Sequence, residues 1–131
     1  MQGKLLTIGD RLVLRDLAGR ELALIEQKPQ LGPRPRYEIQ REGRLAATVR
    51  QAAVVGQRFE VEVPAAGGGL RVAGDFLGNE YVFTRDGHTV ATVSRRWTLG
   101  DTYGVEIVAG EDEVLILALM VAIERVHHAE S

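Results

Sequence analysis

Two pairs of arginines are the side chains with the clearest potential for ligand binding. One pair stands just before Tyr37 and the other just before Trp97, at equivalent places beside expected strands. A guanidinium group suits the planar oxygens of a phosphate or carboxylate. If the two segments adjoin, they can hold an anionic group; exposed arginines paired with neighbours such as Glu38 are the simpler alternative. The candidate ligand-binding residues are Arg34, Arg36, Arg95 and Arg96.

Residues for catalysis or metal binding are sparse. The chain has no cysteine, and Ser94 lies in an expected strand without the Gly-x-Ser-x-Gly elbow of a hydrolase. His127 and His128 follow Glu124 by about one helical turn and could form a weak metal site. We favour their ordinary role as favourable cations at a helix C-terminus. We therefore predict no catalytic residue, no metal and no cofactor, and a protein that is not an enzyme, with an unrecognised active site as an alternative.

Composition narrows the class of protein. The 131 residues fit a single domain spanning 1–131. With 16 basic and 18 acidic residues the net charge is -2, so the overall basic excess of a nucleic-acid binder is missing. The absence of cysteine and of a signal-peptide pattern leads us to expect a cytoplasmic location.

Alternation of apolar and polar residues predicts strands along most of the chain. Phe59, Val61 and Val63 alternate with glutamates, as in a half-buried strand. Turn sequences such as Asp86-Gly87 separate these runs, and Asp-Gly between two strand-like segments is a strong hairpin signal. The pattern therefore indicates antiparallel hairpins.

The hairpins share an internal repeat with Gly19, Gly43 and Gly87 as origins. An alanine stands four residues after each origin and a β-branched residue stands six after it. A valine or a tyrosine stands six before it. The repeat predicts a meander or barrel of similar two-stranded units. Its aligned positions are Ala23, Ala47 and Ala91; Ile25, Val49 and Val93; and Val13, Tyr37 and Tyr81.

The C-terminal segment has a different pattern. Residues 114–123 are ten consecutive apolar residues, with acids before them and cations after them, as suits the helix dipole. Ten residues are too few for a bilayer span, which needs ~20. The run has no polar face, so we predict a helix at about 111–127 buried inside the sheet and not transmembrane; a buried strand is the competing interpretation.

Several segments together resemble the LURP-one-related family, including its bacterial members. The resemblance extends over nearly the whole chain, and its most specific parts are Arg-Arg-Trp-Thr-Leu-Gly-Asp-Thr-Tyr at 95–103 and the apolar C-terminal segment. It implies a mainly β (α+β) fold, a closed antiparallel tubby-like β-barrel around a central hydrophobic helix. The other matching segments are residues 5–10, 21–28, 34–39 and 74–76.

The resemblance also sets expectations about function. Tubby domains share this architecture with phospholipid-scramblase domains and bind phosphoinositides, although fold by itself does not carry function. We therefore expect a non-enzymatic binding or scaffold module, with an anionic phospholipid headgroup or a protein as partner. The alternative is a structural or regulatory interaction module acting as a homo-oligomer.

One departure from the family pattern bears on oligomeric state. Family members usually begin with an additional hairpin before the segment that resembles residues 3–28, and this sequence begins at that later segment. A barrel without two strands has unpaired edges, which natural proteins protect. We expect a homodimer or a more open barrel.

Overall fold

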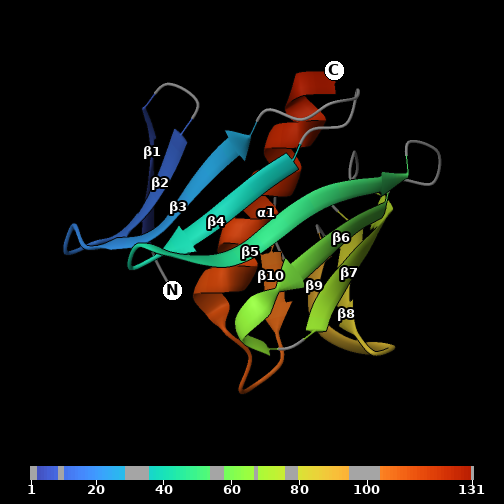
Figure 1. Ribbon diagram of the computed structural model, residues 1–131. Coiled ribbons are helices and arrows are strands. Elements are labelled where there is room, and N and C mark those ends of the chain that lie inside the picture. Colours follow the sequence, from blue (N-terminus) through green and yellow to red (C-terminus); the bar gives the residue numbers. More distant parts are fainter. Residues whose placement is uncertain are drawn as a thin grey trace.

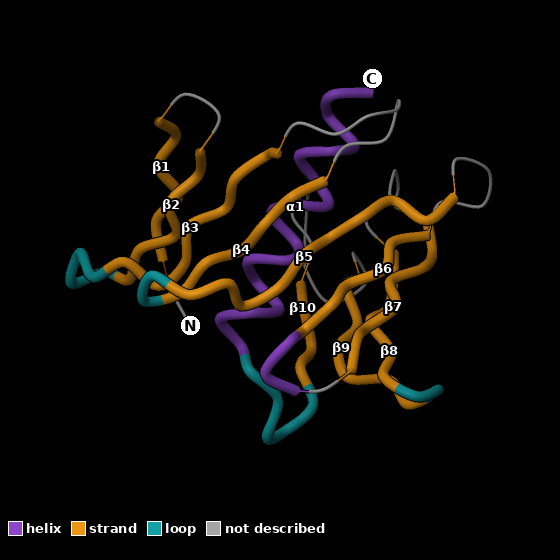
Figure 2. Tube along the Cα trace, viewed as in Figure 1, coloured by secondary structure: helices purple, strands orange, loops and turns teal. Residues whose placement is uncertain are grey.

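The computed structural model describes residues 3–8, 11–28, 36–53, 58–66, 68–75, 80–94 and 104–130. Strands dominate these residues, with one long helix at the C-terminal end (Figure 2). The elements in chain order are β1 (Gly3–Ile8), β2 (Arg11–Asp16), β3 (Glu21–Lys28), β4 (Arg36–Arg41), β5 (Arg44–Ala53), β6 (Arg58–Val63), a short 3-10 helix (Pro64–Ala66), β7 (Gly68–Asp75), β8 (Glu80–Arg85), β9 (His88–Ser94), β10 (Gly104–Ile107) and α1 (Glu113–Glu130).

The ten strands form one sheet in which their order in space equals their order in the chain. Every pairing is antiparallel, so the sheet is a continuous meander. The sheet curves, and α1 lies against β3, β4 and β5 on its inner face (Figure 1). The predicted mainly β class is thus confirmed. The predicted closure of a barrel is not shown, because no pairing joins β1 to β10 among the described strands.

Two of the hairpins turn as their sequences predict. The β4–β5 turn has positive φ at both Glu42 (53°) and Gly43 (75°), and the β8–β9 turn repeats this at Asp86 (51°) and Gly87 (81°). Positive φ at both central positions defines the type I′ turn, whose twist matches that of the flanking strands. The Asp-Gly hairpin prediction is therefore confirmed for residues 86–87.

The internal repeat is visible as a repeated β-bulge. In each of three hairpins the register shifts one step after a large inner residue opposes an alanine. The small alanines are buried completely or nearly so, as are the β-branched residues two positions later. A shared bulge gives each hairpin the same local twist. The three opposed pairs are Leu14 with Ala23, Ile39 with Ala47, and Phe83 with Ala91.

One aligned position of the repeat is wrong. Tyr37 and Tyr81 do oppose Val49 and Val93, but the residue that opposes Ile25 is Leu12, not Val13. The β2–β3 turn is longer than the other two, which displaces the equivalent residue by one position. Because successive side chains in a strand point to opposite faces, this displacement by one position turns the Val13 side chain away from the inner face.

The C-terminal helix runs from Glu113 to Glu130, starting two residues later and ending three residues later than predicted. Its apolar segment fills the interior: Ala118, Leu119 and Ala122 have no exposed surface. Val114, Leu117 and Val121 are half-buried, and their spacing places them along one stripe of the helix. The prediction of a buried apolar helix is confirmed except along that stripe.

In the part of the chain that the structure describes, no helix has the length and apolarity needed to cross a membrane.

Polar contacts fix the start of α1 against the turns of two hairpins. The Asp112 carboxylate accepts a hydrogen bond from the backbone N–H of Leu115 (3.2 Å), which is an N-cap. The same carboxylate pairs with Arg41 at the end of β4. Arg85, at the end of β8, donates to both oxygens of Glu111 (2.8 and 2.9 Å). The N-terminal end of α1 therefore lies at the end of the sheet that carries the short turns.

Candidate anion-binding site

The structure describes one of the four predicted ligand-binding arginines. Arg36 is the first residue of β4, and its side chain is half-buried on the outer face of the sheet. Arg34, Arg95 and Arg96 lie outside the described residues. Whether the two arginine pairs adjoin therefore stays a prediction.

Arg36 belongs to a line of cations that the sequence prediction missed. Lys28, the last residue of β3, lies directly opposite Arg36, and Arg36 lies directly opposite Arg50 of β5. We call Lys28, Arg36 and Arg50 the basic row. Directly opposed residues of antiparallel strands have Cβ atoms about 4.5–5.5 Å apart, and like charges in such positions repel. The basic row is thus a site where a bound anion would relieve repulsion.

An acidic row runs beside the basic row on the same face of the sheet, two residues further along the strands. We use the name for Glu26, Glu38 and Glu62, on β3, β4 and β6. The ion-pair distances are 3.6 Å from Lys28 to Glu26, 3.7 Å from Arg36 to Glu38, and 3.6 Å from Arg50 to Glu62. These distances exceed those of hydrogen bonds. The acidic row balances charge without saturating the donors of the basic row.

Two further features weaken the interaction between the acidic row and the basic row. Glu26 is shared, because Arg11 also approaches it at 3.2 Å and Gln40 donates to it at 3.4 Å. The Nε of Arg36 is buried and has no hydrogen-bond partner among the described residues. A guanidinium with unused donors is well suited to an oxyanion, which can accept two of its N–H groups.

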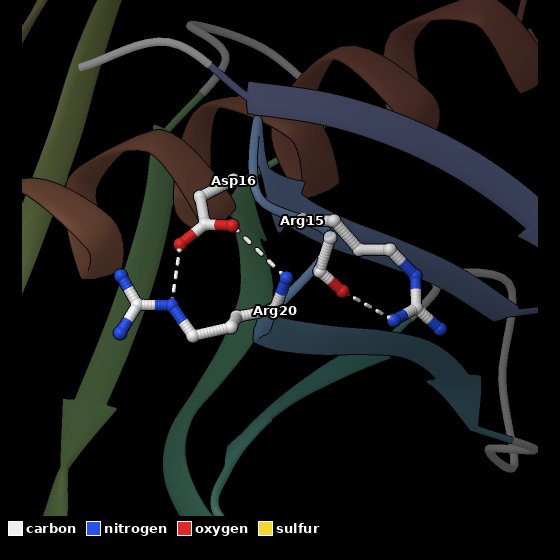
Figure 3. Close-up of polar contacts among 4 residues, drawn as sticks. Arg15, Asp16 and Arg20 are labelled. Atoms are coloured by element: carbon white, nitrogen blue, oxygen red, sulfur yellow. Dashed lines mark hydrogen bonds and ion pairs between the residues drawn. The ribbon is translucent and has the colours of Figure 1, made fainter.

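The arginines of the β2–β3 turn are bound differently. Asp16 accepts hydrogen bonds from the backbone N–H and from the Nε of Arg20, both at 2.9 Å, and Arg15 donates to the Gly19 carbonyl at 3.0 Å (Figure 3). The pKa of Asp16 is lowered, first by the backbone hydrogen bond from Arg20. Here the donors already serve the turn, so this turn is a useful comparison for the basic row.

The C-terminal half of α1 places titratable groups at the end of the sheet opposite the short turns. Burial raises the pKa of Glu124 to about 7. Burial also raises the pKa of Tyr81, and the nearby Glu124 carboxylate raises it further. Burial raises the pKa of Tyr37 as well, against the opposing effect of Arg125. Shifted pKa values of this kind mark Glu124 as a proton-binding group near neutral pH.

The remaining predicted candidates have structural surroundings. Ser94 is fully buried and donates a hydrogen bond to Glu80 (3.1 Å). His88, the first residue of β9 beside the β8–β9 turn, is exposed. Within the described ranges, no group of three or more histidines or acids could hold a metal ion. The side chains of His127 and His128 are not among those described.

A hollow of about 570 Å³ lies on the outer face of β6 and β7, beside the β8–β9 turn. Glu60, Glu62 and Asp86 at its border are acidic, and Arg71 supplies a single cation there. This surface has the wrong charge for an anion, which leaves the basic row as the better candidate.

Comparison with known proteins places the chain in a family. The family model described as LURP-one-related matches residues 1–124, and the chain belongs to that family. A relative in Bacillus subtilis (strain 168), the uncharacterised protein YxjI, is 27% identical over 128 residues, which are 96% of this chain and 76% of that protein. No solved structure gives a significant match.

Proposed function

We propose that this protein is a non-enzymatic binding module whose basic row takes an anionic group, with the phosphate headgroup of a lipid as its preferred form. The observation that carries the proposal is the direct opposition of Lys28, Arg36 and Arg50 on three adjacent strands. Their carboxylate neighbours remain beyond hydrogen-bond distance. Family membership supports the fold of such a module but assigns no ligand.

The adjacency of three cations on neighbouring strands is the reason to expect an anion and not a neutral ligand. Arg11, Lys28, Arg36 and Arg50 form ion pairs with the three carboxylates of the acidic row, and Glu60 lies directly opposite Arg50 as a fourth carboxylate. The unused Nε of Arg36 adds a directional donor at the centre. Because the row is part of three strands and not of a loop, its geometry is set before the ligand arrives.

The proposal is tested by binding to vesicles of phosphatidylcholine alone, with phosphatidylserine, or with a phosphatidylinositol bisphosphate. We expect binding to the anionic vesicles that weakens as salt rises, because exposed charges are screened. Soluble inositol phosphate in competition separates headgroup recognition from recognition of a membrane surface. Failure to bind anionic vesicles at low salt contradicts the proposal.

A double variant tests the row itself. Replacing Arg36 and Arg50 with alanine should weaken binding about thirtyfold, because each cation near an anionic surface contributes about 1 kcal/mol. The matched control replaces Arg20 and Arg44 with alanine, which removes the same charge from the other end of the sheet, at the β2–β3 turn and the start of β5. An equal loss in both variants would indicate a nonspecific effect of net charge.

A further inference from the structure

Within the described part of the chain, the last strand of the sheet has a partner strand along one edge only. β10 pairs with β9 on one side, and no described strand pairs with its other side. β1, at the other end of the strand order, likewise pairs with β2 alone among the described strands. An open edge displays backbone N–H and C=O groups that can pair with another chain.

The hydrogen-bond pattern shows which groups β10 displays. The backbone N–H of Val108 donates to the Val90 carbonyl (2.9 Å). Antiparallel neighbours alternate between hydrogen-bonded and non-hydrogen-bonded pairs. The register therefore places Val105 and Ile107 in non-hydrogen-bonded pairs with Val93 and Ala91. Their N–H and C=O groups therefore point away from β9, to the open edge.

The side chains of the same two residues leave apolar surface uncovered. Val105 and Ile107 oppose buried inner residues but are themselves half-buried. With Leu117 and Glu113 of α1 they line a hollow of about 170 Å³. A partner that binds at this edge must supply both backbone hydrogen-bonding groups and apolar side chains. An extended strand supplies both.

We propose that the strand comes from a second copy of this chain, with β1 of each protomer pairing against β10 of the other. Charge decides between β1 and β10 as the partner strand. Two β10 strands would bring together two exposed Glu106 residues, whereas β1 carries Lys4 among apolar residues. A two-fold dimer of this kind closes both open edges at once, which a foreign strand would not do.

Sedimentation velocity of the wild-type protein across a range of concentrations gives the first test. The expected result is a reversible monomer–dimer equilibrium. Val105→Pro removes the N–H that faces the open edge and leaves the hydrogen bonds to β9 intact, so the monomer keeps its fold, as circular dichroism can verify. It should raise the dimer dissociation constant at least about tenfold, because two symmetric hydrogen bonds are lost.

A charge exchange tests the partner strand without changing the backbone. Lys4→Glu and Glu106→Lys should each weaken the dimer, and the double variant should restore it. A wild-type protein that remains monomeric at all concentrations overturns the proposal. So does a dimer that Val105→Pro leaves unchanged, and so does a double variant no stronger than either single variant.

Discussion

The surroundings of Glu124 strongly change the pKa of its carboxyl group. Its pKa is raised from 4.5 to about 7 because burial disfavours the charged carboxylate. In the unfolded chain the group ionises near its ordinary pKa. Glu124 therefore opposes folding least below pH 4.5. Its burial lowers the free energy of unfolding progressively as the pH rises from 4.5 to about 7.

Replacing this carboxyl with an amide should remove the pH-dependent loss. Glu124→Gln is expected to be more stable than wild type by about 2 kcal/mol at pH 8, allowing for partial exposure. The difference should shrink as the pH falls toward 4, where both proteins are uncharged at this position. Denaturant unfolding at several pH values measures it, and a difference that does not vary with pH would contradict the assignment.

Gly74 is required by both its backbone and its neighbours. Its φ is +144°, and a Cβ built there would stand 2.5 Å from the Glu80 carbonyl oxygen and 2.6 Å from the Tyr81 Cα. Gly74→Ala should destabilise the protein by at least about 2 kcal/mol in thermal or denaturant unfolding. Gly68 of the same strand has open space around its Cα, so Gly68→Ala is the control and should change stability little. Equal effects would contradict this reading of β7.

At the residue scale, the sequence predicted inner residues better than outer ones. Alternation identified Phe59 and Val61 correctly as buried. The basic row was missed because the opposition of Arg36 and Arg50 depends on a bulge between Ile39 and Gln40. Counting outward from the turn without that bulge gives a register that is wrong by one residue. The same kind of shift misplaced Val13.

The elements depend on contacts at their ends as much as on their own sequences. Asp112 caps α1 through the N–H of Leu115 and also pairs with Arg41. Asp112→Ala should therefore cost about 1–2 kcal/mol of stability, because a cap and an ion pair are lost together. Arg41→Ala removes the ion pair and keeps the cap, so it should cost less in the same unfolding experiment. A larger loss in Arg41→Ala would show that the cap contributes little.

Helix identity was predictable at this scale, and its boundaries were not. An apolar run of ten residues between acids and cations matches a buried helix, as observed. The start was placed two residues early because Glu111 and Asp112 are acidic, as helix starts often are. Instead they precede the helix and bind arginines of two hairpins, which are distant in the sequence.

In the whole molecule, α1 serves as the core around which the sheet curves. Leu119 is fully buried, whereas Leu117, two residues away, is half-buried beside β10. Leu119→Ala should lower the free energy of unfolding by about 3–4 kcal/mol, because the surrounding side chains cannot move to fill the cavity that it leaves. Leu117→Ala removes the same atoms and should cost much less. Similar losses in the two variants would mean that the interior is not centred on α1.

The architecture was predictable from hairpin signals and one apolar run, because both are local patterns. Closure was not, because it depends on how β1 and β10 lie after all the twists and bulges between them have accumulated. The candidate site was predicted only as two pairs of arginines, and its anionic ligand stays a prediction. Its described members depend on register across three strands.

The most direct test of the proposed anion site is an NMR titration of the isotope-labelled protein with inositol phosphate. We expect saturable amide shifts centred on Lys28, Arg36 and Arg50 that disappear in the Arg36→Ala, Arg50→Ala double variant. The amides of the β2–β3 turn should not move. Absence of saturable shifts, or shifts centred away from the basic row, would contradict the proposed anion site.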